Sequence, residues 1–227
     1  RAFVRVEVIR KSNSSKFTYH MFKRLNTGGE ELSQQQIRNC TIRMLSSKFI
    51  DFIIELSKDE NFKQCIDNIS ETQQLESFDQ ELVLRFFALK NYSNHFKHDV
   101  SDFLTEYMEK VTNEEEKFDY FVEKEIFLKT FNLLKESWGA KIFGRINKNK
   151  TKIQSNFAIY HFEALTIGIQ ASLDKLNKEL INEIKNTIKS IKCDNEFIDL
   201  TTGGGKNSRG LLQKRIEFVN NKFSELS

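Results

Sequence analysis

The sequence predicts a mainly α-helical protein, an irregular multi-helix domain with one short amino-terminal β-strand. The 227 residues include no proline, the residue that interrupts helices most strongly. Apolar residues recur at steps of three or four along most of the chain, which is the helical period. The 21 phenylalanines indicate that aromatic packing fills much of the core.

The first expected elements lie within residues 1–42. Residues 2–9 form the expected strand, because apolar and charged side chains alternate from Val4 to Val8, as in a half-buried strand. Because a lone strand leaves its backbone groups unpaired, we expect it to complete a sheet built by residues upstream. A helix follows whose apolar side includes Phe17 and Met21, and Gly28 suits the left-handed residue that ends it. Ser33 is the expected N-cap of the next helix, and Gln36 completes a capping box.

Later apolar stripes predict further helices. The stripes cover residues 42–56 with a break near residues 46–47, then 78–89, 100–108, 118–126, 173–191 and 212–223. Thr112 and Glu115 form a T-x-x-E capping box before the stripe at 118–126, and Ser208 is the expected N-cap of the last helix. The stripe at 173–191 is the most regular. Since the chain has no internal repeat and no low-complexity linker, we expect the helices to pack together as one domain.

Composition limits the classes of function. A net charge of +3 is too small to indicate nucleic-acid binding by itself, so an electrostatic argument needs local clustering. The three cysteines are odd in number and far apart, so we expect buried thiols and neither a disulfide framework nor a zinc site. No apolar run approaches the roughly 20 residues of a membrane span, and residues 1–10 lack the apolar core of a signal peptide. We therefore expect a cytoplasmic protein without a membrane partner.

The most informative local feature is a glycine turn between two amphipathic helical patterns, within residues 22–39. Free backbone N–H groups at the start of the second helix, next to Arg24 and Arg38, can hold an anion. The alternative is an ordinary corner between two helices, whose arginines are solvated or pair with Glu30 and Glu31. The residues alone leave both interpretations open.

Three segments carry a resemblance to a known family. The string FKRLNTGGEELSQQQIRN at residues 22–39 is similar to the signature F-x-R-L-N-T-G-G-x-x-L-x-x-Q-E-I-R-N. RFFALKNYSNHFKHDVSDFLTEYM at 85–108, and FGRIN with NFAIYHFEAL inside 143–165, resemble later helical landmarks of the same family. The chain thereby resembles the GmrSD-type restriction and defence proteins over nearly its whole length.

The resemblance implies a particular place in the family's architecture. Members carry a ParB-like amino-terminal domain with a DGQQR motif, which this sequence lacks, and the chain opens at Arg1 without a methionine. We therefore expect a carboxy-terminal portion of such a protein, with the ParB-like domain mostly missing. The expected division is the end of that domain at 1–40, comprising the strand, a helix and the NTGG loop, and a helical domain at 41–227.

The resemblance also implies binding residues. Its expected nucleotide or phosphate contacts are Arg24, Asn26, Thr27, Gly28, Gly29, Arg38 and Asn39. The intact protein would bind a nucleoside triphosphate with Mg²⁺ and act on foreign, often modified, DNA, whereas this portion alone would hold no cofactor and no catalytic residue. Expected partners are DNA, the missing amino-terminal domain, and a partner nuclease domain or a second copy of the chain.

Two basic segments are candidate DNA contacts. The first lies beyond Trp138 and Phe143 and contains Arg145, Lys148, Lys150 and Lys152. Basic residues near aromatic rings can engage phosphates and stack bases, although a short basic loop is often simply solvated. The second is the glycine-rich segment 201–210, with Lys206 and Arg209, which Lys214 and Arg215 follow. It fails the spacing of a P-loop, so we interpret it as a connector with a possible second basic patch.

The familiar catalytic patterns are missing from the sequence. The four histidines lack the spacing of a zinc motif, and there is no H-E-x-x-H or G-x-S-x-G. His95 and His98 stand beside Asp99 and Asp102, which makes a metal site conceivable, but we interpret this segment as a surface turn. We expect no catalytic residue and no metal ligand in this chain.

Two functions from different classes follow. The first is a DNA-binding and nucleotide-binding portion of a GmrSD-like anti-phage restriction protein. The second is a non-catalytic helical interaction or regulatory module, in which the 26–39 loop only fixes the packing of two helices. The first expects Arg24 and Arg38 to converge on an open electropositive loop, and the second expects both to pair with carboxylates. A member that has lost nuclease activity and only regulates is a third possibility.

Overall fold

The computed structural model describes Met21 and residues 32–226, and this part of the chain is helical. Its α-helices are α2 (Gln34–Ile42), α3 (Lys48–Leu56), α4 (Glu60–Cys65), α5 (Glu71–Leu75), α6 (Phe78–Tyr92), α7 (Val100–Thr112), α8 (Tyr120–Trp138), α9 (Ile159–Gly168), α10 (Ile181–Cys193), α11 (Asn195–Thr201) and α12 (Arg209–Ser224). Short 3₁₀ turns are η2 (Ser93–His95), η3 (Gly139–Lys141), η4 (Gln170–Ser172) and η5 (Lys178–Leu180). The predicted mainly α-helical class is confirmed for these residues. The predicted strand at 2–9 lies outside them, as does the first helix up to Gly28 apart from Met21.

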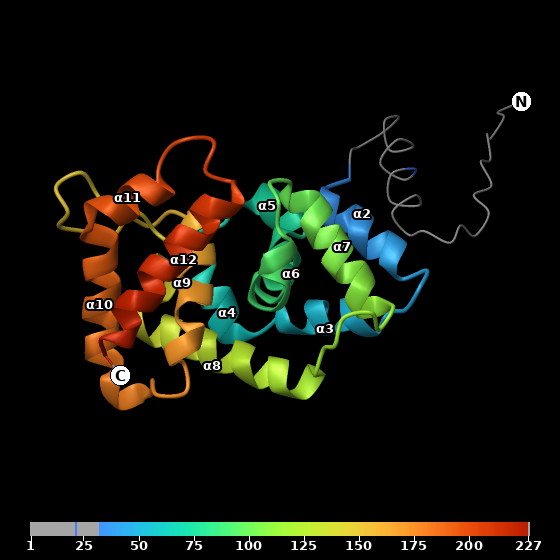
Figure 1. Cartoon of the computed structure of the whole chain (residues 1–227), viewed down its shortest axis with the longest axis horizontal. Coiled ribbons are helices and arrows are strands. Elements are labelled where there is room, and N and C mark those ends of the chain that lie inside the picture. Colours follow the sequence, from blue (N-terminus) through green and yellow to red (C-terminus); the bar gives the residue numbers. More distant parts are fainter. Residues whose placement is uncertain (1–20, 22–31, 227) are drawn as a thin grey trace, which may run out of the picture.

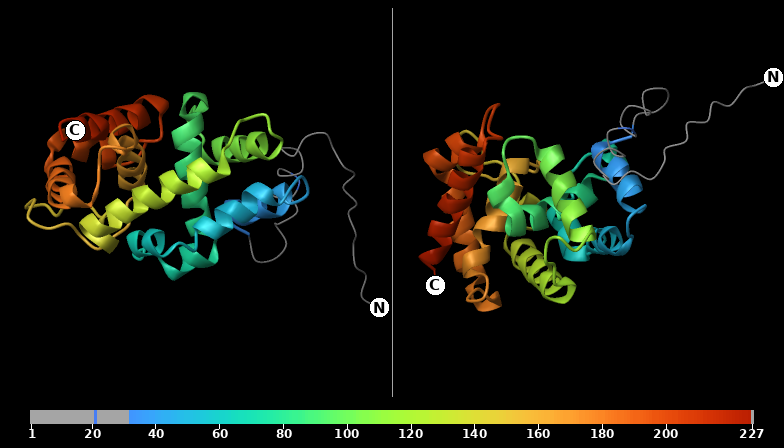
Figure 2. Two further views of the ribbon diagram at one scale, coloured as in Figure 1. Left: turned by 90° about the horizontal axis from the view of Figure 1, so that it is seen from below. Right: turned by 45° about the vertical axis from the view of Figure 1, so that its right-hand side comes forward.

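Helix α6 is the centre of the fold. Every residue from Leu82 to Leu89 is buried, which is the pattern of a helix surrounded on all sides. Figure 1 shows α6 in the middle of the molecule, with α2, α3 and α7 towards one end and α9 to α12 at the other, and Figure 2 shows the same division from a second direction. Helix α8 runs along both groups.

Phenylalanine rings fill the space between α4, α6 and α8. Phe62, Phe86, Phe127 and Phe131 are all fully buried, with the closest ring centroids 4.4 Å apart, between Phe127 and Phe131. The contacts range from tilted, as between Phe127 and Phe131 at 45°, to edge-on, as between Phe62 and Phe131 at 88°. Such contacts add to the stability gained by burial. The phenylalanine-rich composition is thus expressed as one connected aromatic core.

Helices α9 and α12 pack unusually closely. A Cβ atom added to Gly168 would lie 2.5 Å from the Cβ of Val219, a distance that real Cβ contacts do not show. Glycine at this position therefore lets the two helix backbones approach. The contact matters for the rest of the molecule because α9 and α12 each supply one member of a buried ionic network described below.

Several predicted helix starts are confirmed, and one predicted capping box is wrong. Ser33 with Gln36 forms the capping box of α2, Ser208 caps α12, and α7 begins at Val100. The predicted capping box at Thr112 is wrong, because Thr112 ends α7 and Glu114 adopts a left-handed conformation (φ 60°) that stops any helix there. Helix α8 begins at Tyr120 instead, where the Asp119 side chain accepts from the N–H groups of the first turn.

The regular stripe at 173–191 is split. Its first part forms a turn and η5, and α10 begins only at Ile181. The Asn177 side chain accepts hydrogen bonds from the N–H groups of Glu179 and Leu180 at 2.9 and 3.3 Å, which favours a restart there over a continuous helix. Leu173 and Leu176 are nevertheless buried, so the apolar spacing reflects burial and not one helix.

Only part of the cysteine prediction is confirmed. Cys65 is a buried thiol, but Cys40 is exposed and Cys193 is half-buried. Cys40 lies on the outer side of α2, whose inner side is occupied by Ile37, Arg38 and Thr41. Sequence spacing alone did not reveal which side of this short helix faces solvent.

Candidate nucleic-acid interface

The structure places Arg38, from the glycine-turn signature, in the interior. Its side chain is 1% exposed and pairs with Glu81 of α6 at 2.7 Å. Its Nε also donates to Gln35 at 2.9 Å, and its Nη1 donates to the hydroxyl of Ser101 at 3.3 Å. The guanidinium is therefore enclosed where α2, α6 and α7 meet.

Asn39 is held in the same junction. Its amide donates to the Gln80 side chain at 2.7 Å and accepts from Gln35 at 2.8 Å. The expected boundary after residue 40 falls inside α2, which packs against α6 and α7. The other expected phosphate contacts lie outside the described residues: Arg24, Asn26, Thr27, Gly28 and Gly29.

Arg38 is the first member of a buried ionic network. Glu81 also accepts from Arg85 at 2.9 Å, and Arg85 pairs with Glu163 of α9 at 2.6 Å. Glu163 in turn pairs with Arg215 of α12. Burial opposes ionisation of Glu81, but the charges of Arg85 and Arg38 outweigh it and hold the pKa of this carboxyl below its usual value.

The ionic network joins the segments that carry the family resemblance. Arg38, Arg85 and Glu163 come from the signature at 22–39, the segment at 85–108 and the segment at 143–165. Arg215 adds α12, stacks on the Tyr160 ring at 4.6 Å and donates to the Lys206 carbonyl at 2.8 Å. The arrangement ties four helices together and leaves these groups engaged with one another, so its evident role is structural.

The first basic segment forms a small hairpin between η3 and α9, comprising residues 144–156. Ile146 and Ile153 make an antiparallel bridge, and Ile153 is buried. At its tip, the side-chain oxygen Oδ1 of Asn147 accepts hydrogen bonds from the backbone N–H groups of Thr151 and Lys152 at 2.8 and 3.0 Å. These bonds define the loop, so its basic side chains project from a fixed frame.

The four basic side chains of this hairpin are exposed. They are Arg145, Lys148, Lys150 and Lys152. None of them forms an ion pair with another residue in the described part of the chain. Lys150, at φ 55°, donates to the Asn195 side chain at 2.6 Å, which fixes the hairpin tip against the start of α11.

The base of the hairpin rests on a buried lysine. Lys192 of α10 is fully buried and donates to the Gly144 carbonyl at 2.7 Å, and its Nζ lies 2.9 Å from His161 Nδ1. Burial lowers the pKa of Lys192 to about 7. Burial, together with the charges of Lys192 and Arg145, lowers the pKa of His161 well below its usual value, so the neutral ring accepts this hydrogen bond.

The two basic segments lie at opposite ends of α11. The hairpin contacts Asn195 at its start, and the glycine-rich segment follows Thr201 at its end, so a helix of about 10 Å separates them. Lys206 is half-buried and Arg209 is exposed, whereas Arg215 is buried beside Glu163 and therefore does not belong to a second basic patch. The acidic side chains of Glu196 and Asp199 are exposed on α11, so the structure does not merge the two basic segments into one continuous cluster.

No family model, curated protein or solved structure matches this chain. Within residues 32–226 and Met21, no helix has the length and apolar character needed to cross a membrane.

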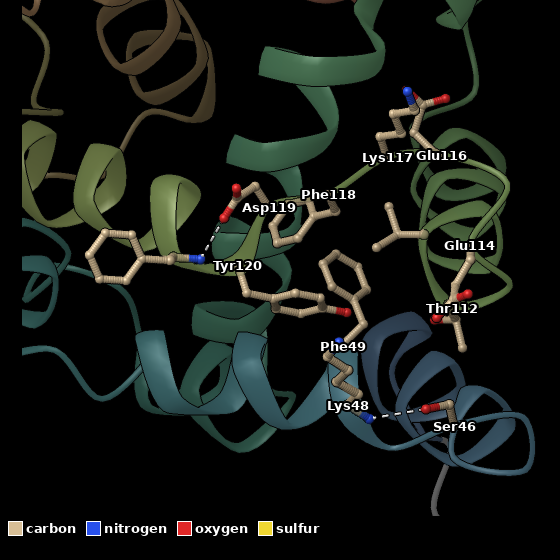
Figure 3. A pocket seen from close by; sticks show the side chains of 12 residues that line it. Ser46, Lys48, Phe49, Thr112, Glu114, Glu116, Lys117, Phe118, Asp119 and Tyr120 are labelled. Atoms are coloured by element: carbon tan, nitrogen blue, oxygen red, sulfur yellow. Dashed lines mark hydrogen bonds between the residues drawn. The ribbon is translucent and has the colours of Figure 1, made fainter.

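A groove lies elsewhere in the described part of the chain, between α3, α7 and α8. It has a volume of about 660 Å³ and is lined by the rings of Phe49, Phe118 and Tyr120 (Figure 3). The ammonium group of Lys48 lies 4.4 Å from the centre of the Tyr120 ring. Burial, and then the Glu114 carboxylate, raise the pKa of Tyr120. None of the sequence-predicted site residues that the structure describes lies in this groove.

The histidine segment forms a surface feature. His95 belongs to η2, is exposed and stacks on Tyr92 with ring centroids 3.9 Å apart, and His98 is also exposed. Asp99 is the N-cap of α7, since its carboxylate accepts from the Asp102 N–H at 2.8 Å. The described residues contain no group of three or more metal-type ligands.

Sequence reasoning missed the residues that build both regions. Glu163 had no local signal, because its partners Arg85 and Arg215 are 78 and 52 residues away. The spacing of four residues between Glu81 and Arg85 was a local signal that was not used. Lys192 is buried although lysine is usually exposed, and nothing in the local sequence marks it as buried. Asn147 had a usable signal, because an asparagine before a short basic loop is typical of a side-chain-capped turn.

Proposed function

We propose that this chain is the helical, non-catalytic portion of a GmrSD-like anti-phage restriction protein, and that it contacts the phosphates of DNA through its basic hairpin. The observation that supports this proposal most directly is the structure of the hairpin. Its four exposed cations share one fixed loop and have no carboxylate partner among the described residues. Cations left unpaired on a defined frame are suited to phosphate contacts, which provide most of the affinity in non-specific DNA binding.

The proposal includes the nucleotide expected for the intact protein, a triphosphate with Mg²⁺, but assigns Arg38 a different role. Because Glu81 occupies its guanidinium, we assign Arg38 to fixing α2 against α6. Contact with a triphosphate would then rest on Arg24, Asn26, Thr27, Gly28 and Gly29. The proposed location is the cytoplasm, and the proposed protein partner is a nuclease domain or a second copy of the chain.

A second candidate is a helical interaction or regulatory module without a DNA-binding role. The pairing of Arg38 with Glu81 favours it, because that alternative expects the signature arginine to hold helices together. The exposed hairpin favours the first candidate. The two candidates therefore differ in whether the hairpin cations bind DNA.

Replacing the hairpin lysines tests the proposal. We expect Lys148→Gln/Lys150→Gln/Lys152→Gln to weaken binding of a labelled DNA duplex, and to reduce the slope of log affinity against log salt by about 2 to 3, if each lysine neutralises one phosphate. Fluorescence anisotropy across a salt series measures both quantities. The matched control is Lys58→Gln/Lys63→Gln/Lys97→Gln, which removes three exposed lysines from other surfaces.

The outcomes separate the two candidates. A reduced slope for the hairpin variant alone supports DNA contact at the hairpin. Equal slopes for the two variants place DNA contact elsewhere, and absence of duplex binding by the unaltered chain favours the interaction module.

A further inference from the structure

The exposed face of α10 adjoins the basic hairpin and has an unusual composition. Ile184, Ile188, Ile191 and Lys192 face the interior, whereas Asn182, Lys185, Asn186 and Lys189 are exposed. These four recur at steps of three or four and therefore form one stripe along the helix. The side chains of the stripe form no hydrogen bond or ion pair within the described part of the chain, and Lys185 lies over the Trp138 ring at 5.2 Å.

The stripe and the hairpin form one surface. The Cys193 thiol donates to the Lys150 carbonyl at 3.7 Å, and the Lys150 ammonium donates to Asn195, immediately beyond α10. Figure 1 shows α10 along one edge of the molecule, with the hairpin at its carboxy-terminal end. The one acidic residue of α10, Glu183, lies at the border of the stripe.

We propose that the α10 stripe, Asn182, Lys185, Asn186 and Lys189, is a docking surface that enters the major groove of duplex DNA, with the asparagines on base edges and the lysines on phosphates. The inference rests on the proposed function, because the hairpin supplies the neighbouring phosphate contacts. The α10 inference adds to the proposed function that the partner is duplex DNA and that the asparagines distinguish its base sequence.

Geometry and charge fit that partner. Helix α10 has 13 residues and is about 20 Å long, and the major groove, about 12 Å wide, admits a helix. Asn182 and Asn186 are one turn apart, so their Cβ atoms are about 5–6 Å apart, close to two base-pair steps of about 3.4 Å. An asparagine amide can donate to and accept from an adenine edge at once.

The same surface is less suited to other nucleic acids. The major groove of an RNA helix is too deep and narrow for side chains to reach the bases. Single strands are held largely by stacking on aromatic rings, and α10 contains no aromatic residue. Duplex DNA is therefore the occupant that the stripe fits.

Two measurements on the whole chain test this inference. First, a duplex is enriched from a random-sequence library, and binding is compared for Asn182→Ala/Asn186→Ala and for Asn221→Ala, an exposed asparagine on α12. Alanine favours helix more than asparagine does, so α10 should be retained. We expect the double variant to bind the enriched duplex about tenfold or more weakly and to keep its affinity for unselected duplex, with Asn221→Ala unchanged.

Second, a photo-crosslinking amino acid, p-benzoylphenylalanine, replaces either Asn186 or Gln64, an exposed residue of α4. We expect irradiation to couple the enriched duplex at position 186 and not at 64. Cross-linking at position 186, together with loss of preference in the double variant, supports the inference.

The contrary outcomes are distinct. If the unaltered chain binds duplex through the hairpin lysines, but the double variant matches Asn221→Ala and position 186 does not cross-link, the α10 inference is wrong and the proposed function remains. Stronger binding of RNA or single-stranded DNA than of duplex overturns the duplex partner. If the chain binds no duplex, both proposals fail.

Discussion

The arginine of the signature segment and the cations of the hairpin have the same charge but opposite surroundings. Arg38 is 1% exposed, and one of its partners is a carboxylate. The hairpin cations are exposed and unpaired within the described residues. In one region the positive charge holds helices together, and in the other it is available to a partner. Residue type alone therefore does not assign a role, because burial and the nearest carboxylate decide it.

The largest expected effect comes from the carboxylate shared by two arginines. Glu163→Gln should lower the free energy of unfolding by about 3–5 kcal/mol, because it leaves Arg85 and Arg215 buried without this counter-charge. Denaturant unfolding followed by circular dichroism measures the change. Glu217→Gln, on the exposed side of α12, is the control. Equal stability of the two variants would show that the ionic network does not hold the helices together.

Arg38 should come next. Arg38→Met should lower the free energy of unfolding by about 2 kcal/mol, less than Glu163→Gln, because Glu81 keeps Arg85 as a partner. Calorimetry with ATP, GTP and CTP in the presence of magnesium tests whether Arg38 contacts a nucleotide or only holds helices together. We expect any nucleotide affinity of the intact protein to remain unchanged. A variant of normal stability that loses nucleotide affinity would reverse the role assigned to Arg38.

Lys192 should make the stability of the protein depend on pH. Its folded pKa of about 7 lies below the ordinary value of 10.5, so between these values the unfolded chain binds the extra proton and stability rises with pH. The slope should approach about 1.4 kcal/mol per pH unit inside that window and vanish below it.

The matched variant is Lys192→Met, which keeps the buried stem and removes the titrating group. Its unfolding free energy should show a smaller rise above pH 7 than that of the unaltered chain, as measured by denaturant unfolding across a pH series. Lys189→Met, an exposed lysine on the same helix, is the control. Identical pH profiles for the unaltered chain and Lys192→Met would mean that Lys192 is not desolvated as the structure shows it.

The smallest effect on stability should come from the hairpin. Lys148→Gln/Lys152→Gln should change the free energy of unfolding by no more than about 0.5 kcal/mol, since both side chains are exposed and unpaired within the described residues. Thermal or denaturant unfolding provides the measurement. A large loss of stability would mean that these lysines hold the fold, as Arg38 does, and the contrast between the two regions would disappear.

Local signals predicted parts of the fold well. The caps at Ser33 and Ser208 follow from side chains that bond to neighbouring N–H groups, an interaction that needs no distant partner. The start of α8 was misplaced because Glu114 takes a left-handed conformation while Phe118 packs against Phe49, with ring centroids 5.1 Å apart. That packing depends on residues nearly 70 positions earlier, which a local pattern does not contain.

The candidate interface was half predictable. The basic residues at 145–152 stand out in the sequence because they are close enough along the chain to share one loop. Their exposure and the fixed frame from Asn147 and Ile153 required the structure. The adjoining α10 stripe was not predictable as part of this interface, because the period shows which residues share a face but not what lies beside that face.

The sequence by itself determined the helical class, the aromatic core and several helix ends, since these depend on composition, period and contacts between near neighbours. Tertiary structure decided which charges are buried. Arg38, Arg85, Glu163 and Arg215 meet only after α2, α6, α9 and α12 have packed, and a buried charge is stable only beside its counter-charge. The hairpin cations had no such partner brought to them within the described fold, and so they remained at the surface.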